Sequence, residues 1–93
     1  MKGNENLLQR LTDKVDLAGE PLPGQTVVEI AGDNRILIEN YCAVREYSPQ
    51  KIDIRVKYGT VIVCGCGLEL RRMTKEQLII SGRIDTVSLQ RRK

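Results

Sequence analysis

The chain has 93 residues, a formal net charge of +3 and no His, Trp or Phe. A chain of this length forms one small domain with a single core. Because His is the commonest general acid or base and the commonest metal ligand, its absence leaves an enzyme only carboxylates, Lys, Tyr and Cys. This narrows the catalytic options, so an enzyme ranks third, below a protein contact and an anion-binding domain. The expectation is a non-enzymatic protein with no catalytic residue, no cofactor and no metal.

The N-terminal part predicts a short amphipathic helix followed by a linker. Within residues 4–17, Leu7, Leu8, Leu11 and Val15 fall on one stripe of a helix. Two prolines and two glycines in residues 18–25 end the helix, so residues 1–25 are assigned to helix and linker. Nothing in the chain has the apolar length of a signal peptide or a membrane span, which predicts a cytoplasmic chain without a transmembrane segment of its own.

From Thr26 onward the apolar period changes to two, which is typical of half-buried antiparallel strands. Ile52, Ile54 and Val56 alternate with charged residues, and the connections between such runs are short. We expect a single β-domain over residues 26–90 and a basic tail at 91–93. The predicted strands are 26–31, 35–39, 42–47, 51–57, 60–64, 68–72, 77–81 and 84–89.

Short connections favour hairpins between neighbours in sequence, so the expected fold is an all-β antiparallel meander of about eight strands. A sheet with this many strands curls or splits rather than staying flat. The meander should therefore form a sandwich or a partly open barrel, with the N-terminal helix packed on it or at its edge.

The stretch GTVIVCGCGLEL, residues 59–70, raises the question of a metal or redox site. A structural zinc ion needs four ligands, and Cys42, Cys64 and Cys66 are the only cysteines in a chain without His. A disulfide between Cys64 and Cys66 would close a strained ring that a reducing cytosol opens. We interpret the stretch as a turn between two strands, with free thiols.

Four apolar residues lie out of phase with the predicted core: Val27, Leu37, Ile62 and Ile79. Either the N-terminal helix or a second sheet layer covers them, or they form a contact surface for a protein partner or a second copy of the chain. Both interpretations are kept open.

The basic end of the chain, Arg91, Arg92 and Lys93, is the candidate for contact with an anion, either nucleic acid or a lipid head group. Small β-domains that bind single strands use stacking aromatic side chains, and only three tyrosines are present. Nucleic-acid binding is therefore expected to be weak and salt-sensitive, and it ranks below a protein contact.

The order of segments resembles the YabP/YqfC family of sporulation proteins, and the YqfC branch in particular. The resemblance covers roughly residues 7–89. It depends most on residues 38–40 (IEN), residues 48–52 (SPQKI) and residues 78–85 (LIISGRID).

This resemblance implies a protein of endospore-forming Firmicutes, made in the mother cell and needed for maturation of the spore envelope, its coat and cortex. It also implies a protein partner, such as a membrane protein encoded nearby, and a peripheral position at the outer forespore membrane. The family has no assigned catalytic residues, and the pair Cys64 and Cys66 is not part of its pattern.

Overall fold

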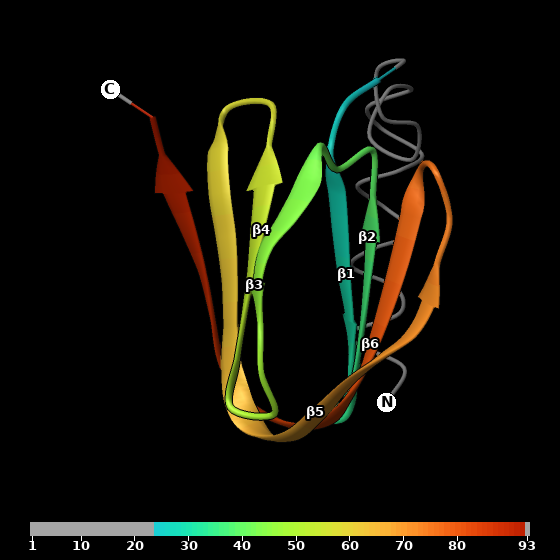
Figure 1. Cartoon of the computed structure of the whole chain (residues 1–93), viewed down its shortest axis with the longest axis vertical. Coiled ribbons are helices and arrows are strands. Elements are labelled where there is room, and N and C mark those ends of the chain that lie inside the picture. Colours follow the sequence, from blue (N-terminus) through green and yellow to red (C-terminus); the bar gives the residue numbers. More distant parts are fainter. Residues whose placement is uncertain (1–23, 93) are drawn as a thin grey trace, which may run out of the picture.

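A computed structural model of the chain describes residues 24–92 as one antiparallel sheet without a helix (Figure 1). The predicted N-terminal helix lies outside these residues. The strands are β1 (Val27–Ala31), β2 (Arg35–Glu39), β3 (Ala43–Tyr47), β4 (Lys51–Val56), β5 (Gly59–Met73) and β6 (Gln77–Arg91). The all-β antiparallel class is confirmed, whereas the prediction of eight strands is wrong.

Two of the six strands are 15 residues long because each continues through a predicted turn. The segments at residues 65–67 and 82–83 are bends in β5 and β6 rather than chain reversals. A Cβ on Gly65 would lie 1.9 Å from the carbonyl oxygen of Arg83, and one on Gly82 would lie 2.5 Å from that of Gly67. Glycine therefore lets the paired strands bend tightly where a side chain would collide with the neighbouring backbone.

The strand order is β1-β2-β6-β5-β4-β3, so the sheet is not a simple meander. Strand β2 pairs with β6 and not with β3, its neighbour in sequence. The link from β2 to β3 passes through Asn40, which has a φ of 62°. The backbone N–H of Asn40 donates to the carbonyl of Glu76 at 2.7 Å, which ties this link to the β5–β6 turn.

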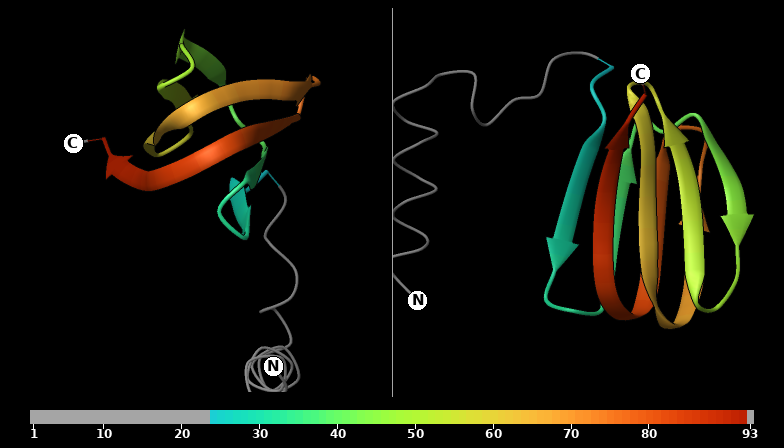
Figure 2. Two further views of the ribbon diagram at one scale, coloured as in Figure 1. Left: turned by 90° about the horizontal axis from the view of Figure 1, so that it is seen from below. Right: turned by 90° about the vertical axis from the view of Figure 1, so that its left-hand side faces the viewer.

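The bent strands fold the sheet over into two layers, seen from two further directions in Figure 2. The first layer contains β1, β2, the start of β6 and the end of β5, and the second contains the end of β6, the start of β5, β4 and β3. In the described part of the chain neither β1 nor β3 pairs with a further strand, so this sheet is open and sandwich-like. The core between the layers is wholly aliphatic and consists of Ile36, Ile38, Ile52, Ile54, Val56, Val61, Val63, Leu68, Leu78 and Ile80.

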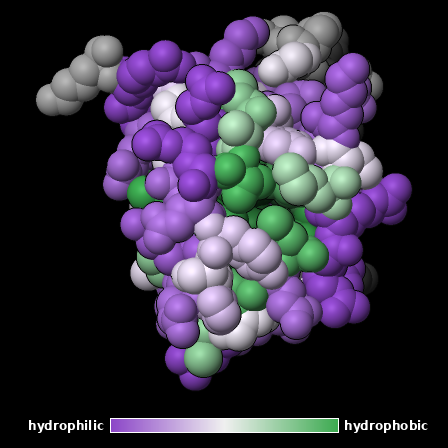
Figure 3. All heavy atoms as spheres, in the orientation of Figure 1, coloured by the Kyte–Doolittle hydropathy of each residue, from purple (hydrophilic) through white to green (hydrophobic). Residues whose placement is uncertain are grey.

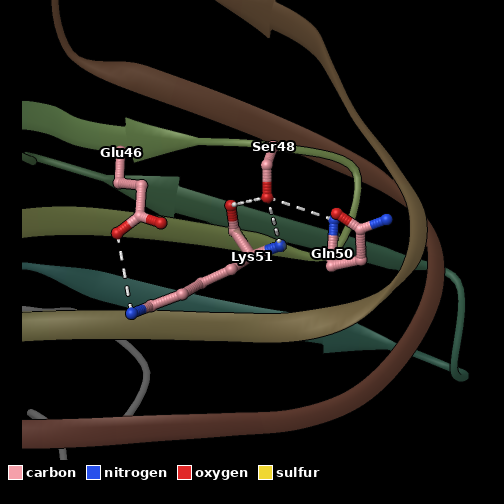
Figure 4. Close-up of polar contacts among 4 residues, drawn as sticks. All are labelled: Glu46, Ser48, Gln50 and Lys51. Atoms are coloured by element: carbon pink, nitrogen blue, oxygen red, sulfur yellow. Dashed lines mark hydrogen bonds and ion pairs between the residues drawn. The ribbon is translucent and has the colours of Figure 1, made fainter.

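The β3–β4 turn owes its shape to one hydroxyl group (Figure 4). The Oγ of Ser48 accepts from the backbone N–H groups of Gln50 at 3.3 Å and Lys51 at 3.0 Å. It also lies 3.3 Å from the carbonyl of Lys51, to which it can donate. Such local bonds let serine stabilise tight turns. An exposed ion pair between Lys51 and Glu46, 3.6 Å long, joins the two strands nearby.

This turn also holds the bend of β5. The carbonyl of Pro49 accepts from the N–H of Leu68 at 2.8 Å, and that of Gln50 accepts from the N–H of Gly65 at 3.0 Å. Backbone groups that the bend takes out of the regular ladder are thereby paired.

The β1–β2 turn does the same for the bend of β6. The carbonyl of Asp33 accepts from the N–H of Ile84 at 2.8 Å, and that of Asn34 accepts from the N–H of Gly82 at 3.3 Å. Each hairpin turn thus fixes one of the two bends, and the bends place the two outer faces on which the candidate site residues lie.

Candidate protein-contact site

Three of the four candidate contact residues gather on the outer face of the first layer. Leu37 of β2 lies directly opposite Ile79 of β6. Their sequence neighbours point into the core, so both side chains point outward, and both are half-buried. Val27 of β1 pairs with Glu39, two residues from Leu37, on the same face. We call Val27, Leu37 and Ile79 the outer apolar patch.

Charged side chains of opposite sign frame the outer apolar patch. Glu29 and Glu39 alternate with its apolar members on β1 and β2. A depression of about 580 Å³ opens beside Ile79 and is lined by Asn34, Arg35, Arg71, Ile79, Ser81 and Gly82. An apolar centre with a charged rim is the usual composition of a surface that contacts another protein.

Ile62 is separated from this patch. It lies in β5 between the buried Val61 and Val63, so it points outward from the second layer. Its cross-strand partners are Asp53 and Ser88. The sequence pattern identified it correctly as out of phase with the core but could not show that the two layers have separate outer faces.

The structure places the basic end of the chain beside two arginines from other strands. A depression of about 330 Å³ is lined by Arg45, Arg55, Gly59, Thr60, Gln90, Arg91 and Arg92. Within residues 24–92 none of these four arginines forms an ion pair. Arg91 is the last residue of β6, and its guanidinium lies 5.7 Å from the ring centre of Tyr58. The third residue of the predicted basic tail, Lys93, lies outside the described residues.

Sequence reasoning missed Arg45 and Arg55 as members of this basic cluster. Alternation along β4 did predict that Arg55 points outward. Its closeness to the chain end, however, depends on a row of partners across the sheet, in which Arg55 pairs with Thr60 and Thr60 with Gln90. Such a row follows from strand order and register, which alternation alone does not give.

Sequence reasoning also missed the large apolar side chains that are more than half exposed. Figure 3 shows apolar side chains between the two halves of the sheet, framed by hydrophilic ones. The exposed large hydrophobic residues within the described chain are Ile30, Tyr47, Met73 and Leu89. The hydroxyl of Tyr47 accepts from the N–H of Leu70 at 3.2 Å, which ties the edge of the second layer to that of the first.

The three cysteines are free thiols. Cys64 is half-buried in β5, and Cys66 is exposed at the bend of that strand rather than at the tip of a turn. Cys42 is exposed in the link between β2 and β3. Among residues 24–92 no group of three or more potential metal ligands lies together.

Within residues 24–92 these features describe a small antiparallel β-domain folded over into two layers. Residues 23–93 match the YabP family, and the chain belongs to that family, as the resemblance predicted. Membership indicates a sporulation-related protein. Neither the comparison with curated proteins nor that with solved structures finds a match. Within the described part of the chain no helix is long and apolar enough to cross a membrane.

Proposed function

We propose that this chain is a non-enzymatic sporulation factor that supports maturation of the spore envelope by binding a protein partner near the outer forespore membrane. The outer apolar patch carries the proposal. Leu37 and Ile79 form a cross-strand apolar pair on a face that the second layer does not cover. A partner that buries this pair gains hydrophobic free energy, and the charged rim gives the contact its specificity.

A matched pair of substitutions tests the patch. Ile79→Glu puts a charge into the patch, whereas Ile62→Glu makes the same change at a half-buried outward position of the other layer. We expect both proteins to stay folded by circular dichroism. Only Ile79→Glu should fail to capture a partner from extracts of sporulating cells and to restore spore formation in a strain that lacks the protein.

A core substitution supplies the reference for unfolding. Ile54→Asp buries an unpaired carboxylate and should unfold the domain. If Ile79→Glu unfolds equally, the patch belongs to the fold and not to an interface. If Ile79→Glu is folded and retains both capture and spore formation, the proposed contact is wrong.

The basic cluster supports a second candidate function, in which the chain binds an anionic lipid surface. Four arginines without an acidic partner among residues 24–92 meet at one end of the second layer. Each Lys or Arg near an anionic membrane contributes about 1 kcal/mol, which is about a fivefold change in affinity. We therefore expect binding to vesicles rich in anionic lipid to fall about fivefold in each of Arg45→Gln and Arg55→Gln.

Arg83→Gln is the matched control for the arginine variants. It removes the same charge from an arginine paired with Asp85 at 3.4 Å, outside the basic cluster. An equal loss of vesicle binding in Arg83→Gln would show that only net charge matters. Single-stranded DNA that competes fully at physiological salt would point to nucleic acid instead.

A further inference from the structure

As described over residues 24–92, the folded-over sheet has four edge segments, and three of them carry features that discourage pairing with another chain. Strand β1 is only five residues long and carries Glu29. The edge at β3 has a register shift between Val44 and Glu46 and two charged residues. The end of β5 has two register shifts, and the hydroxyl of Tyr47 bonds one of its N–H groups. Short strands, bulges, charges and covering side chains are the usual means of protecting edges.

The fourth edge, the C-terminal half of β6, lacks this protection. Among residues 24–92 it pairs only with β5, and its register is regular from Thr86 to Arg91. Residues 86–90, TVSLQ, contain no charge, proline or glycine. Figure 1 shows this segment as the outermost strand at one side of the sheet. Leu89 within it is 59% exposed.

The backbone groups of this edge that point away from β5 can be identified. The N–H of Arg92 donates to the carbonyl of Tyr58, and the register continues in step from there. Because hydrogen-bonded and non-hydrogen-bonded pairs alternate in an antiparallel ladder, Ser88 directs its N–H and C=O toward β5. Val87 and Leu89 therefore direct theirs outward, and no backbone hydrogen bond to either from outside the β5 ladder occurs within residues 24–92.

We propose that the C-terminal half of β6 pairs antiparallel with the same segment of a second copy of the chain, with Ser88 at the twofold axis. In this register Val87 lies opposite Leu89 of the other copy. Their outward backbone groups then meet as hydrogen-bonded pairs. The second layers of the two copies become one continuous sheet.

Charge complementarity selects this register and favours a second copy over another occupant. With Ser88 opposite itself, the regular pairs end with Thr86 opposite Gln90 of the other copy, and Arg91 of each copy then lies beside Asp85 of the other, the residue that the register shift leaves out of the β5 ladder. Asp85 forms an exposed ion pair with Arg83 of its own chain at 3.4 Å, and Arg91 adds a second cation to that carboxylate. Opposite charges that approach each other across paired strands are favourable. The self-pairing segment is thus uncharged in the middle, with Val87 and Leu89 as its apolar residues, and has opposite charges near its two ends. This inference goes beyond the proposed partner contact and does not depend on the outer apolar patch.

Site-specific crosslinking tests the register. In the full chain with its three cysteines changed to Ser, we introduce Ser88→Cys, Thr86→Cys or Gln90→Cys. Residues facing each other in a non-hydrogen-bonded pair come within the range of a disulfide, so Ser88→Cys should form a covalent homodimer rapidly under mild oxidation. Thr86→Cys alone should form no such dimer, because the two introduced cysteines lie four residues apart along the paired strands, about 13 Å. Thr86→Cys mixed with Gln90→Cys should give a heterodimer.

A second comparison tests the energetics of the pairing. Leu89→Lys should weaken self-association, measured by sedimentation equilibrium, by about tenfold or more, because two contacts with Val87 are lost per dimer. Ile30→Lys makes the same change on β1 at a side chain of similar exposure, 54% against 59%. It should leave the dimer intact, and both variants should keep the parent circular dichroism spectrum.

Two results would overturn the proposal, and amide exchange shows the cause of the first. A full chain that stays monomeric up to about 1 mM excludes pairing with a second copy. If the amides of Val87 and Leu89 exchange slowly in that monomer, another segment of the same chain covers the edge, and if they exchange fast the edge is free. Equal crosslinking of all three single-cysteine proteins would show random collision.

Discussion

Glycines decide where β5 and β6 bend, and neighbouring glycines do so for different reasons. At Gly65 the limit is space, because the carbonyl of Arg83 occupies the place of a side chain. At Gly67 the space is open, but the φ of 64° lies in the left-handed region. The two positions should therefore respond differently to the same substitution.

We expect Gly65→Ala to lower the free energy of unfolding by about 3 kcal/mol or more, since the backbone must move to admit the methyl group. Gly67→Ala should cost only about 1–2 kcal/mol, from the left-handed conformation. Urea denaturation measures both. Gly67→Asn should cost less than Gly67→Ala, because Asn tolerates this region. Equal losses in the two alanine variants would contradict the steric account of Gly65.

The cysteines should be dispensable for stability. Cys42 and Cys66 are exposed and Cys64 is half-buried on an outer face, so changing all three to Ser should alter the free energy of unfolding by about 1 kcal/mol or less. Metal analysis of the reduced parent protein provides the check. Stoichiometric zinc that disappears in the triple variant, with a loss of several kcal/mol, would show a structural metal site.

At the scale of elements, the two hairpin turns act as supports for the bent strands. The β3–β4 turn bonds the bend of β5 and the β1–β2 turn bonds the bend of β6. The residues SPQKI, which carry part of the family resemblance, build the first of these turns. These residues therefore stabilise the bend of β5, which follows them by more than ten residues in the sequence.

Ser48→Ala should lower the free energy of unfolding by about 1 kcal/mol, because the hydroxyl bonds within the turn are lost. Hydrogen exchange should also become faster at Gly65 and Leu68, whose N–H groups bond to this turn. Ser48→Thr keeps the hydroxyl group and should behave like the parent. Faster exchange confined to β3 and β4 would mean that the turn does not support the bend.

The apolar period of two predicted most of the strands but not where the long ones end. Strands β1 to β4 lie within a residue or so of the predicted ranges. The error came at Gly65–Gly67 and Gly82, where glycine marks a bend as readily as a turn. A bend differs from a chain reversal here because its backbone N–H groups donate to turns elsewhere in the chain. A local sequence pattern does not show these distant hydrogen bonds.

For the candidate site, the sequence likewise predicted the direction of the side chains but not which of them lie together. Alternation placed Leu37, Ile62 and Ile79 on outer faces, as observed. It could not pair Leu37 with Ile79 or separate Ile62 from them, because both facts follow from the pairing of β2 with β6 and from the folding of the sheet. The gathering of Arg45 and Arg55 near Arg91 has the same origin.

At the scale of the molecule, both layers share one aliphatic core, and β5 and β6 run through both. The domain should therefore unfold in a single transition. Ile38→Val in the first layer and Ile54→Val in the second should each cost about 0.5–1.5 kcal/mol and move the same transition. The amide signals of β2 and β4, followed by NMR in urea, should disappear together. Separate midpoints would show two independent halves.

The pairing of β2 with β6 also sets the order in which the nascent chain can fold. Strand β2 pairs with β6 from Arg35 opposite Ser81 onward, and these two residues are far apart in the sequence. Strands β1 and β2 therefore leave the ribosome long before β6 has been synthesised. An isolated two-stranded hairpin is marginal in water. Strands β3, β4 and the start of β5 can pair as they emerge, but their apolar face has no opposite layer until β6 arrives. Completion of the last strand therefore closes the fold, and a chain halted before it exposes the apolar surfaces of both layers to aggregation.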